Sequence, residues 1–326
     1  MRDSRTNATP EQMAKALADC ASFAICGHVN PDGDCLGSAL ALAHALRAMD
    51  KDVTVLLVED SPIEPGLLFL PGIEDFVPAE RYIGTPEAFV YVDVSVRQRI
   101  GVAAAIADAA QHRFAIDHHA GTEDVAELNL IDPDAASCTM LVWDVVNALD
   151  VEISAETAMC AYAGLMTDTG RFQYQNTDER AFLHAAGMVA AGAQPAVAGR
   201  EFFQNRSIAS LRLEQRMVSR MEILMDGQVA FSYLSLDDFS ECEAENSDAE
   251  ALIDTLRSVR GVRAACILKE RNGFVRGSLR AKDDDTDVAA MARVLGGGGH
   301  RAAAGFTLEV SLEEAIARVK DELSRL

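Results

Sequence analysis

The sequence is poor in aromatic residues, has a single tryptophan and contains no long apolar run. Aromatic residues account for 6% of its 326 residues, whereas 49% of the residues are hydrophobic. A large hydrophobic share with few aromatics and abundant alanine favours a helix-rich α/β protein over a β-sandwich. A membrane-spanning helix needs about 20 consecutive apolar residues, and the sequence offers no such run. We therefore expect no membrane partner.

The sequence also lacks any Cys-x-x-Cys pair. Its seven cysteines are scattered and odd in number, which is unlike a disulfide framework. The segment from Met1 to Pro10 has no apolar stretch of the kind found in signal peptides. We expect reduced thiols and a cytoplasmic protein.

Basic residues are scarce relative to acidic ones. Lys and Arg number 29 against 51 Asp and Glu, which gives a formal net charge of -22. Such a charge opposes binding to a long nucleic acid duplex, because that needs a basic track to neutralise the phosphates. It does not oppose a short nucleotide at one site, since divalent cations and a few arginines reverse the field locally. Solubility alone would explain the same charge.

Apolar runs and helical segments alternate in the first part of the chain. We expect strands at 22–27 and 52–58 and in the runs that end at Asp93 and Asp117, with helices at 11–19, 36–49 and 99–110. This alternation predicts a parallel, doubly wound sheet. Further helices are expected at 137–149, 154–167 and 178–191.

The last third of the chain has a different pattern. Strands are expected at 229–234, 264–269, 274–280 and 306–310, and helices near 249–258, 286–295 and 311–325. These elements predict a smaller α+β domain. The expected division is therefore a first domain over 1–191, a helical connector over 192–215 and a second domain over 216–326.

Acidic and histidine residues follow three of the expected strands of the first domain. The segment Gly27–Asp34 follows the first, Asp93 ends the next, and Asp117-His118-His119 ends another. Open α/β sheets bind ligands at the carboxyl ends of their strands. A two-metal site for phosphoester hydrolysis needs oxygen ligands, imidazoles and one bridging carboxylate. The candidate metal ligands are His28, Asp32, Asp34, Asp93, His118 and Asp168.

Each of these residues also has a local explanation. Asp34 would cap the helix expected from Leu36. Asp32 with Gly33 would form an ordinary turn. Their shared position at the ends of neighbouring strands favours the metal site.

A glycine run in the second domain predicts a phosphate-binding loop. Gly296 to Gly299 would expose backbone N–H groups to a phosphate, and His300 and Arg301 would add positive charge. Ser278 and Arg280 alternate onto one face of an expected strand, where a guanidinium would grip a phosphate with two hydrogen bonds. The alternatives are a tight turn with a solvated Arg301 and an Arg280 on the sheet surface. The candidate substrate-binding residues are Ser278, Arg280, Gly297, Gly298, Gly299, His300 and Arg301.

In these motifs the sequence resembles the DHH phosphoesterase superfamily. The matching segments are 27–34, 92–95, 117–119, 164–172 and 296–305, in the expected order, and the last resembles the signature of the DHH-associated C-terminal domain. Among its subgroups, the sequence is most similar to the bifunctional oligoribonucleases and 3'-phosphoadenosine 5'-phosphate (pAp) phosphatases, or nanoRNases. The resemblance implies a catalytic parallel-sheet DHH domain, a smaller substrate-binding domain and an active-site cleft between them.

The resemblance also implies roles for single residues. His28 and Asp32 would hold one Mn²⁺, Asp34, His118 and Asp168 would hold a second, and Asp93 would bridge the two. Mg²⁺ or Co²⁺ are possible substitutes, since the mixed nitrogen and oxygen ligands do not select one metal. The catalytic residues would be Asp93 and His119. His119 would stay free of the metals and would hydrogen-bond the substrate phosphate or the leaving group. Cys35 stands where similar sequences often have alanine, either as an oxidation-sensitive thiol or as a buried small residue.

The expected function is Mn²⁺-dependent hydrolysis of pAp and of RNA of about two to five nucleotides to nucleoside monophosphates. Dinucleotides, linear or cyclic, are alternative substrates. The alternative enzymes are a DHH-type inorganic pyrophosphatase and a RecJ-like single-strand exonuclease, and the alternative without catalysis is a nucleotide-sensing module. A homodimer is expected from the resemblance alone.

Overall fold

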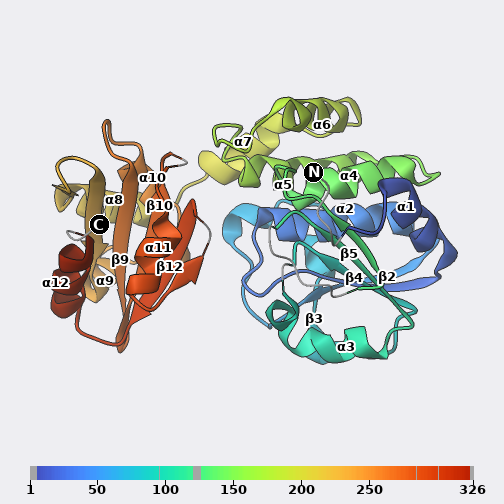
Figure 1. The fold of residues 1–326 in the computed structure, drawn as a ribbon, viewed down its shortest axis with the longest axis horizontal. Coiled ribbons are helices and arrows are strands. Elements are labelled where there is room, and N and C mark those ends of the chain that lie inside the picture. The colour runs from blue at the N-terminus through green and yellow to red at the C-terminus, as the bar shows by residue number, and fades with distance from the viewer. Residues whose placement is uncertain (1–5, 95, 120–125, 284, 300, 324–326) are drawn as a thin grey trace. The chain divides into compact units, whose positions relative to one another are not determined.

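The computed structural model describes residues 6–94, 96–119, 126–283, 285–299 and 301–323 (Figure 1). The chain divides into two compact units, 1–204 and 205–326. The division falls inside the segment 192–215 in which we expected a connector. That segment contains helix α7 (Pro195–Phe203) and the first part of helix α8 (Ile208–Ser219).

Unit 1 contains a six-stranded sheet in which every neighbouring pair is parallel, in the order β3-β2-β1-β4-β5-β6. The strands are β1 (Ser22–Cys26), β2 (Asp52–Leu57), β3 (Val77–Pro78), β4 (Ala88–Val92), β5 (His112–Asp117) and β6 (Leu128–Ile131). The order reverses between β1 and β4, and such a switch point is where open α/β sheets bind ligands. The predicted parallel sheet is confirmed.

Helices cover both faces of this sheet (Figure 1). One face carries α1 (Pro10–Asp19), α2 (Gly33–Arg47) and α4 (Cys138–Ala148), with α5 (Ala155–Asp168) and α6 (Glu179–Ala190) packed outside these helices, and the other face carries α3 (Ala104–Ala109). Alternate residues of a central strand therefore enter different cores, and all five residues of β4 are buried. A parallel sheet covered on both faces is expected to have such continuous apolar strands.

Several short 3₁₀ helices complete unit 1 and part of unit 2. They are η1 (Pro65–Leu67), η2 (Ile73–Asp75), η3 (Ala79–Arg81), η4 (Arg97–Ala103) and η5 (Ser247–Ala249). The helix expected near 99–110 is replaced by η4 and α3. Gly101, with a positive φ of 47°, introduces a further kink inside η4.

Unit 2 is the smaller α+β unit that the sequence predicts. Its sheet has the order β11-β12-β10-β9-β8-β7, and of its neighbouring pairs only β8 with β9 is parallel. The strands are β7 (Glu222–Leu224), β8 (Val229–Leu234), β9 (Ala264–Arg271), β10 (Phe274–Ala281), β11 (Gly298–Gly299) and β12 (Ala303–Leu308). The helices after α8 are α9 (Leu236–Glu241), α10 (Leu252–Arg257), α11 (Val288–Val294) and α12 (Leu312–Leu323).

Two separate cores hold unit 2 together. Helices α11 and α12 pack on one face of the sheet, and α8, α9 and α10 pack on the other. Along β10, Val275, Leu279 and Ala281 enter the first core. The alternate residues Arg276, Ser278 and Arg280 project from the opposite face, where Arg276 is exposed.

Among the residues that the structure describes, no single helix is both long and apolar enough to cross a membrane. Only the bent pair α6 and α7 passes such a test of length and composition, with an angle of 111° between the two helices.

Candidate metal centre and nucleotide site

The six predicted metal ligands of unit 1 come together at the carboxyl end of its sheet. His28 follows β1, Asp93 follows β4 and His118 follows β5, which are neighbouring strands. Asp32 and Asp34 lie at the start of α2, and Asp168 is the last residue of α5. The site therefore lies at the switch point of the strand order.

Asp93 lies between the two histidines and offers one carboxylate oxygen to each. Its Oδ2 is 3.3 Å from His28 Nε2, and its Oδ1 is 3.5 Å from His118 Nε2. Asp32 Oδ2 is 3.8 Å from the same nitrogen of His28. A carboxylate that presents its two oxygens to separate imidazoles has the arrangement of a ligand that bridges two cations.

The second group of ligands surrounds His118. Its Nε2 lies 3.3 Å from Asp168 Oδ2 and 3.7 Å from Asp34 Oδ2. The candidate ligand atoms of Asp34, His118 and Asp168 lie within 4.8 Å of one another, as do those of His28, Cys35 and Asp93. Cys35 is therefore close to the first group, although its side chain is almost fully buried, as the packing explanation requires.

Backbone carbonyls orient both imidazoles. His28 Nδ1 lies 2.9 Å from the carbonyl oxygen of Val29, and His118 Nδ1 lies 3.2 Å from that of Ala135. Because a carbonyl oxygen only accepts, each Nδ1 carries the proton and each Nε2 faces the carboxylates. Metal-binding histidines are commonly held in this way.

Asp34 is held from the far side by the start of α4. Its Oδ2 accepts a hydrogen bond from the backbone N–H of Cys138 at 2.6 Å, and its Oδ1 accepts one from Thr139 at 2.9 Å. The alternative explanation, in which Asp34 caps α2, is wrong. Asp32 is the cap, since its Oδ1 accepts from the N–H of Cys35 at 3.0 Å.

Two glycines allow the helices to approach this centre. A Cβ on Gly164 would lie 2.9 Å from Asp34 Oδ1 and 2.4 Å from Cγ2 of Thr139. A Cβ on Gly37 would lie 2.5 Å from the carbonyl oxygen of Cys160, so α2 crosses α5 closely there. Both glycines therefore allow close packing around the ligands.

The charge balance of the centre favours cations. Burial, strengthened by the charge of Asp93, raises the pKa of Asp34 to about 7. Burial and the charge of Asp34 also raise the pKa of Asp168. Burial opposes ionisation of Asp93, but the neighbouring His118 and His28 outweigh it and lower its pKa. Several carboxylates thus share one buried site, and a bound cation would favour their charged forms.

The surroundings of the Asp93 carboxylate show whether a metal would fit this centre. Its Oδ1 is buried and has no hydrogen-bond partner among the described residues. The nearest imidazole nitrogens, on His119 and His118, lie at 3.4 and 3.5 Å without hydrogen-bond geometry. Asp93 also holds a positive φ of 57°, which is uncommon for a residue with a side chain. An orphaned, buried carboxylate oxygen on a strained residue fits a metal ligand.

Asp117 is a site residue that the sequence analysis did not assign. It is fully buried, and its Oδ1 accepts from His119 Nδ1 at 2.8 Å and from the backbone N–H of His118 at 2.9 Å. This carboxylate fixes the orientation of His119 beside Asp93. The signal for Asp117 was its place in the Asp-His-His motif.

The predicted substrate residues lie in unit 2 around β10, β11 and β12. Ser278 and Arg280 share one face of β10, opposite Gly305 and Ala303 of β12. Arg280 Nη1 donates to the carbonyl oxygen of Leu279 at 3.0 Å. Arg301 is exposed and donates to the carbonyl oxygen of Asp285 at 3.2 Å. His300 lies outside the described residues.

The glycine run combines a tight turn with an open backbone. A Cβ on Gly297 would lie 2.1 Å from the carbonyl oxygen of Gly305, and Gly299 has a positive φ of 143°. Both positions require glycine for structural reasons. Gly298 differs, because a Cβ there would meet nothing within 4 Å among the described atoms. The space beside Gly298 is therefore open, although β11 pairs Gly298 with Gly305 of β12.

A hollow of about 290 Å³ lies beside Gly298. It is lined by Arg276, Gly296, Gly297, Gly298, Gly305, Phe306 and Thr307. Arg276 was missed in the sequence, although it alternates with Ser278 and Arg280 on β10. Neither Ser278 nor Arg280 lines the hollow itself.

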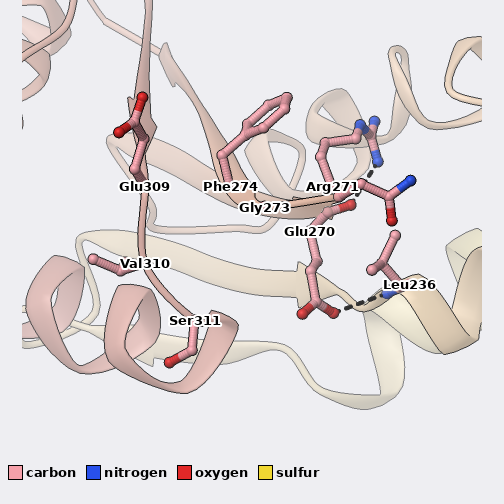
Figure 2. A pocket seen from close by; sticks show the side chains of 9 residues that line it. Leu236, Glu270, Arg271, Gly273, Phe274, Glu309, Val310 and Ser311 are labelled. Atoms are coloured by element: carbon pink, nitrogen blue, oxygen red, sulfur yellow. Dashed lines mark hydrogen bonds between the residues drawn. The ribbon is translucent and has the colours of Figure 1, made fainter.

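A second hollow of unit 2, of about 500 Å³, lies at the β9–β10 hairpin (Figure 2). It contains none of the predicted substrate residues. Its lining includes the carboxylates of Glu270 and Glu309, and Glu270 accepts a hydrogen bond from the backbone N–H of Leu236 at 2.9 Å. Arg271 also lines it, but the two carboxylates make it a poorer receptor for a phosphate than the first hollow.

Known proteins share both sequence and fold with this chain. Residues 22–165 match the DHH family, N-terminal domain, and residues 226–325 match the DHHA1 domain. A bifunctional oligoribonuclease and PAP phosphatase NrnA of Thermus thermophilus is 30% identical over 307 residues, which cover 92% of this chain and 90% of that protein. The protein of the same name from Bacillus subtilis is 26% identical, covering 86% of this chain and 87% of its own.

A solved structure has the same fold over nearly the whole chain. It is an exopolyphosphatase-related protein from Bacteroides fragilis, with a TM-score of 0.90 and 27% identity. The match covers 97% of this chain and 95% of that one. Together with the sequence matches, it shows that the chain belongs to the DHH family of phosphoesterases, which are metal-dependent hydrolases of phosphoester bonds.

Proposed function

We propose that this chain hydrolyses short oligoribonucleotides to nucleoside monophosphates and pAp to a nucleoside monophosphate and phosphate, with two Mn²⁺ ions as its metals. The position of Asp93 carries the proposal, since its two carboxylate oxygens face histidines of two separate ligand groups. The similarity to NrnA proteins supports the substrate class. A cytoplasmic location and a homodimer belong to the same proposal.

The residues of unit 1 would divide between the two metals. His28 and Asp32 would hold one, Asp34, His118 and Asp168 would hold the other, and Asp93 would contact both. When bound, the cations supply Lewis-acid chemistry that makes water more acidic and neutralises charge on phosphoryl oxygens.

His119 would act on the substrate rather than on a metal. Its Nδ1 donates to the buried Asp117, which orients the ring. In the doubly protonated ring, Nε2 would donate a hydrogen bond to a phosphate oxygen or to the leaving group. Asp117 is a positioning residue in this proposal.

The open backbone of unit 2 would hold the end of the substrate that is not cleaved. Gly298 and Gly299 would offer N–H groups to a phosphate, and Arg276 lies beside Gly298 in the hollow. The N–H of Gly297, which the sequence also suggested, instead donates to the carbonyl oxygen of Ala292 at 2.8 Å. Ser278, Arg280, His300 and Arg301 would add contacts, as expected from the sequence. A held end would limit the number of nucleotides that reach the metals, so short substrates would be preferred.

A product assay with the purified chain in Mn²⁺ tests the proposal. The substrates are pAp, a 5'-labelled dinucleotide, a 24-nucleotide RNA, linear and cyclic diadenylate, and pyrophosphate. We expect turnover of pAp and the dinucleotide, with the long RNA spared. Preference for the long RNA would contradict the held end, and turnover of pyrophosphate alone would contradict the substrate class.

A further inference from the structure

A second cluster of metal-binding side chains lies at the amino end of the same sheet. Cys20 precedes β1, Glu87 precedes β4, and His112 is the first residue of β5. One ligand atom from each of these residues lies within 4.8 Å of the others. The predicted catalytic ligands follow the opposite ends of the same strands. A five-residue strand such as β4 is about 17 Å long, so the two sites are separate.

The parallel register holds this cluster together. Ala88 pairs with Phe23 of β1 and with His112 of β5, which brings the three strand starts side by side. Glu87 is fixed further, since its Oε2 accepts from the backbone N–H of Ala21 at 2.6 Å. Its N–H donates to Ser22 Oγ at 3.0 Å. These hydrogen bonds hold Glu87 against the start of β1.

His112 is oriented like a metal ligand. Its Nδ1 lies 2.7 Å from Oε1 of Glu127. A carboxylate on one ring nitrogen sets the tautomer and leaves the other nitrogen as the electron-pair donor, an arrangement common around zinc. Glu127 would therefore support the site without binding the metal.

The surrounding charges favour a cation. Around the Cys20 thiol, the negative charges of Glu87, Asp19 and Glu127 outnumber the positive charge of Lys51. Cys20 is 3% exposed, whereas Glu87 and His112 are partly exposed. The site thus has a protected sulfur and an accessible side through which an ion can enter.

We propose that Cys20, Glu87 and His112 form a binding site for a borderline transition-metal ion such as Zn²⁺. A thiolate with an imidazole and a carboxylate is a ligand set typical of Zn²⁺ or Co²⁺, whereas the carboxylate-rich catalytic centre suits harder ions. Three protein ligands leave a fourth position for water. A bound ion would tie the end of α1 to the starts of β4 and β5 and would stabilise unit 1.

Co²⁺ tests the proposal, because a thiolate ligand gives Co²⁺ a strong charge-transfer absorption in the near ultraviolet. The full chain is first saturated with Mn²⁺, and Co²⁺ is then titrated. We expect the band in the wild-type chain and its loss in Cys20→Ser. Glu127→Gln should weaken Co²⁺ binding by about 10- to 100-fold, as for other outer partners of metal ligands.

Cys35→Ala is the matched control, because the sulfur of Cys35 lies within 4.8 Å of candidate ligand atoms of His28 and Asp93. The band should persist in Cys35→Ala. Its loss there, its persistence in Cys20→Ser, or its absence from the wild-type chain would overturn the proposal. Mn²⁺-dependent turnover of pAp should be retained in Cys20→Ser, which shows that the variant is folded. If Cys20→Ser loses that turnover, His112→Gln is used in place of Cys20→Ser, with the same requirement that the Co²⁺ band is lost and the turnover retained.

Discussion

The metal centre of unit 1 and the glycine-rich face of unit 2 position their residues in opposite ways. At the metal centre, Asp34 and Asp93 are buried and each is contacted from several elements. On the face of unit 2, Gly298 and Arg276 are exposed, and the backbone of the glycine run is itself the candidate phosphate-binding group. The first design suits ions that demand fixed ligands, and the second suits a substrate that must bind and leave.

The largest effect is expected at the residue that joins the two ligand groups. Asp93→Asn keeps the shape of the side chain but removes the charge that two cations would share. Turnover of pAp should fall by about 10³-fold or more, which corresponds to several kcal/mol of lost electrostatic stabilisation. Bound Mn²⁺, measured by atomic absorption after gel filtration, should fall as well.

Asp132→Asn is the control for this prediction. Asp132 is a partly exposed carboxylate that pairs with Arg180 in the same unit. Its loss should leave turnover and Mn²⁺ content nearly unchanged. Substantial Mn²⁺-dependent turnover in Asp93→Asn would show that Asp93 does not bridge.

A smaller effect is expected where a buried residue acts through a neighbour. Asp117→Asn keeps a side-chain oxygen but removes the charge that orients His119. We expect kcat to fall by about 10- to 100-fold, in the range found for outer partners of functional residues. The pH dependence of kcat should shift, while the Mn²⁺ content should stay unchanged. A loss of Mn²⁺ in parallel with kcat would instead indicate a structural role.

The contrast between the two regions also explains what the sequence could predict. His28, Asp93 and His118 each follow an apolar run, so their convergence follows from the rule for parallel sheets. The contact of Asp34 with the N–H groups of α4 was not predictable, because it joins residues 104 and 105 positions apart. Local spacing suggested a helix cap for Asp34 instead, and the cap is Asp32.

In unit 2 the sequence predicted the main strands and missed the shortest ones. β7 and β11 have only three and two residues, which is too short for any periodic pattern. Arg276 was missed for another reason. It shares the face of Ser278 and Arg280, but the hollow beside it is completed by Gly296 to Gly298 and Gly305 to Thr307, which lie far from it in the sequence.

An effect smaller than that of Asp117→Asn is expected on the exposed face of unit 2. Arg276→Gln should raise KM for pAp by about tenfold with kcat nearly unchanged, since a charge-assisted hydrogen bond contributes about 1.5–3 kcal/mol and binds ground and transition states alike. Arg318→Gln, on the exposed side of α12, is the control. Equal effects of the two substitutions would mean that only the overall charge matters.

The smallest effect is expected at an imidazole–carboxylate pair that lies apart from the metal centre. His184 Nε2 is 2.9 Å from Asp144 Oδ1, and its Nδ1 donates to the carbonyl oxygen of Arg180. The hydrogen bond to Asp144 raises the pKa of His184 despite burial. The pair should therefore stabilise the fold fully below the ordinary histidine pKa of about 6.5, and the contribution should vanish as pH rises through the higher folded-state pKa.

This partly exposed pair should contribute about 1 kcal/mol or less. The measurement is the free energy of unfolding of His184→Gln and of the wild-type chain at about pH 5.5 and pH 8.5, which bracket the ordinary histidine pKa. The difference between the two proteins should be larger at the lower pH. Asp144→Asn should show the same dependence, since it removes the other partner. If the difference in free energy of unfolding between wild type and variant instead grows with pH, His184 is neutral in the folded chain. A neighbouring carboxylate would then not be enough to keep an imidazole of this fold protonated.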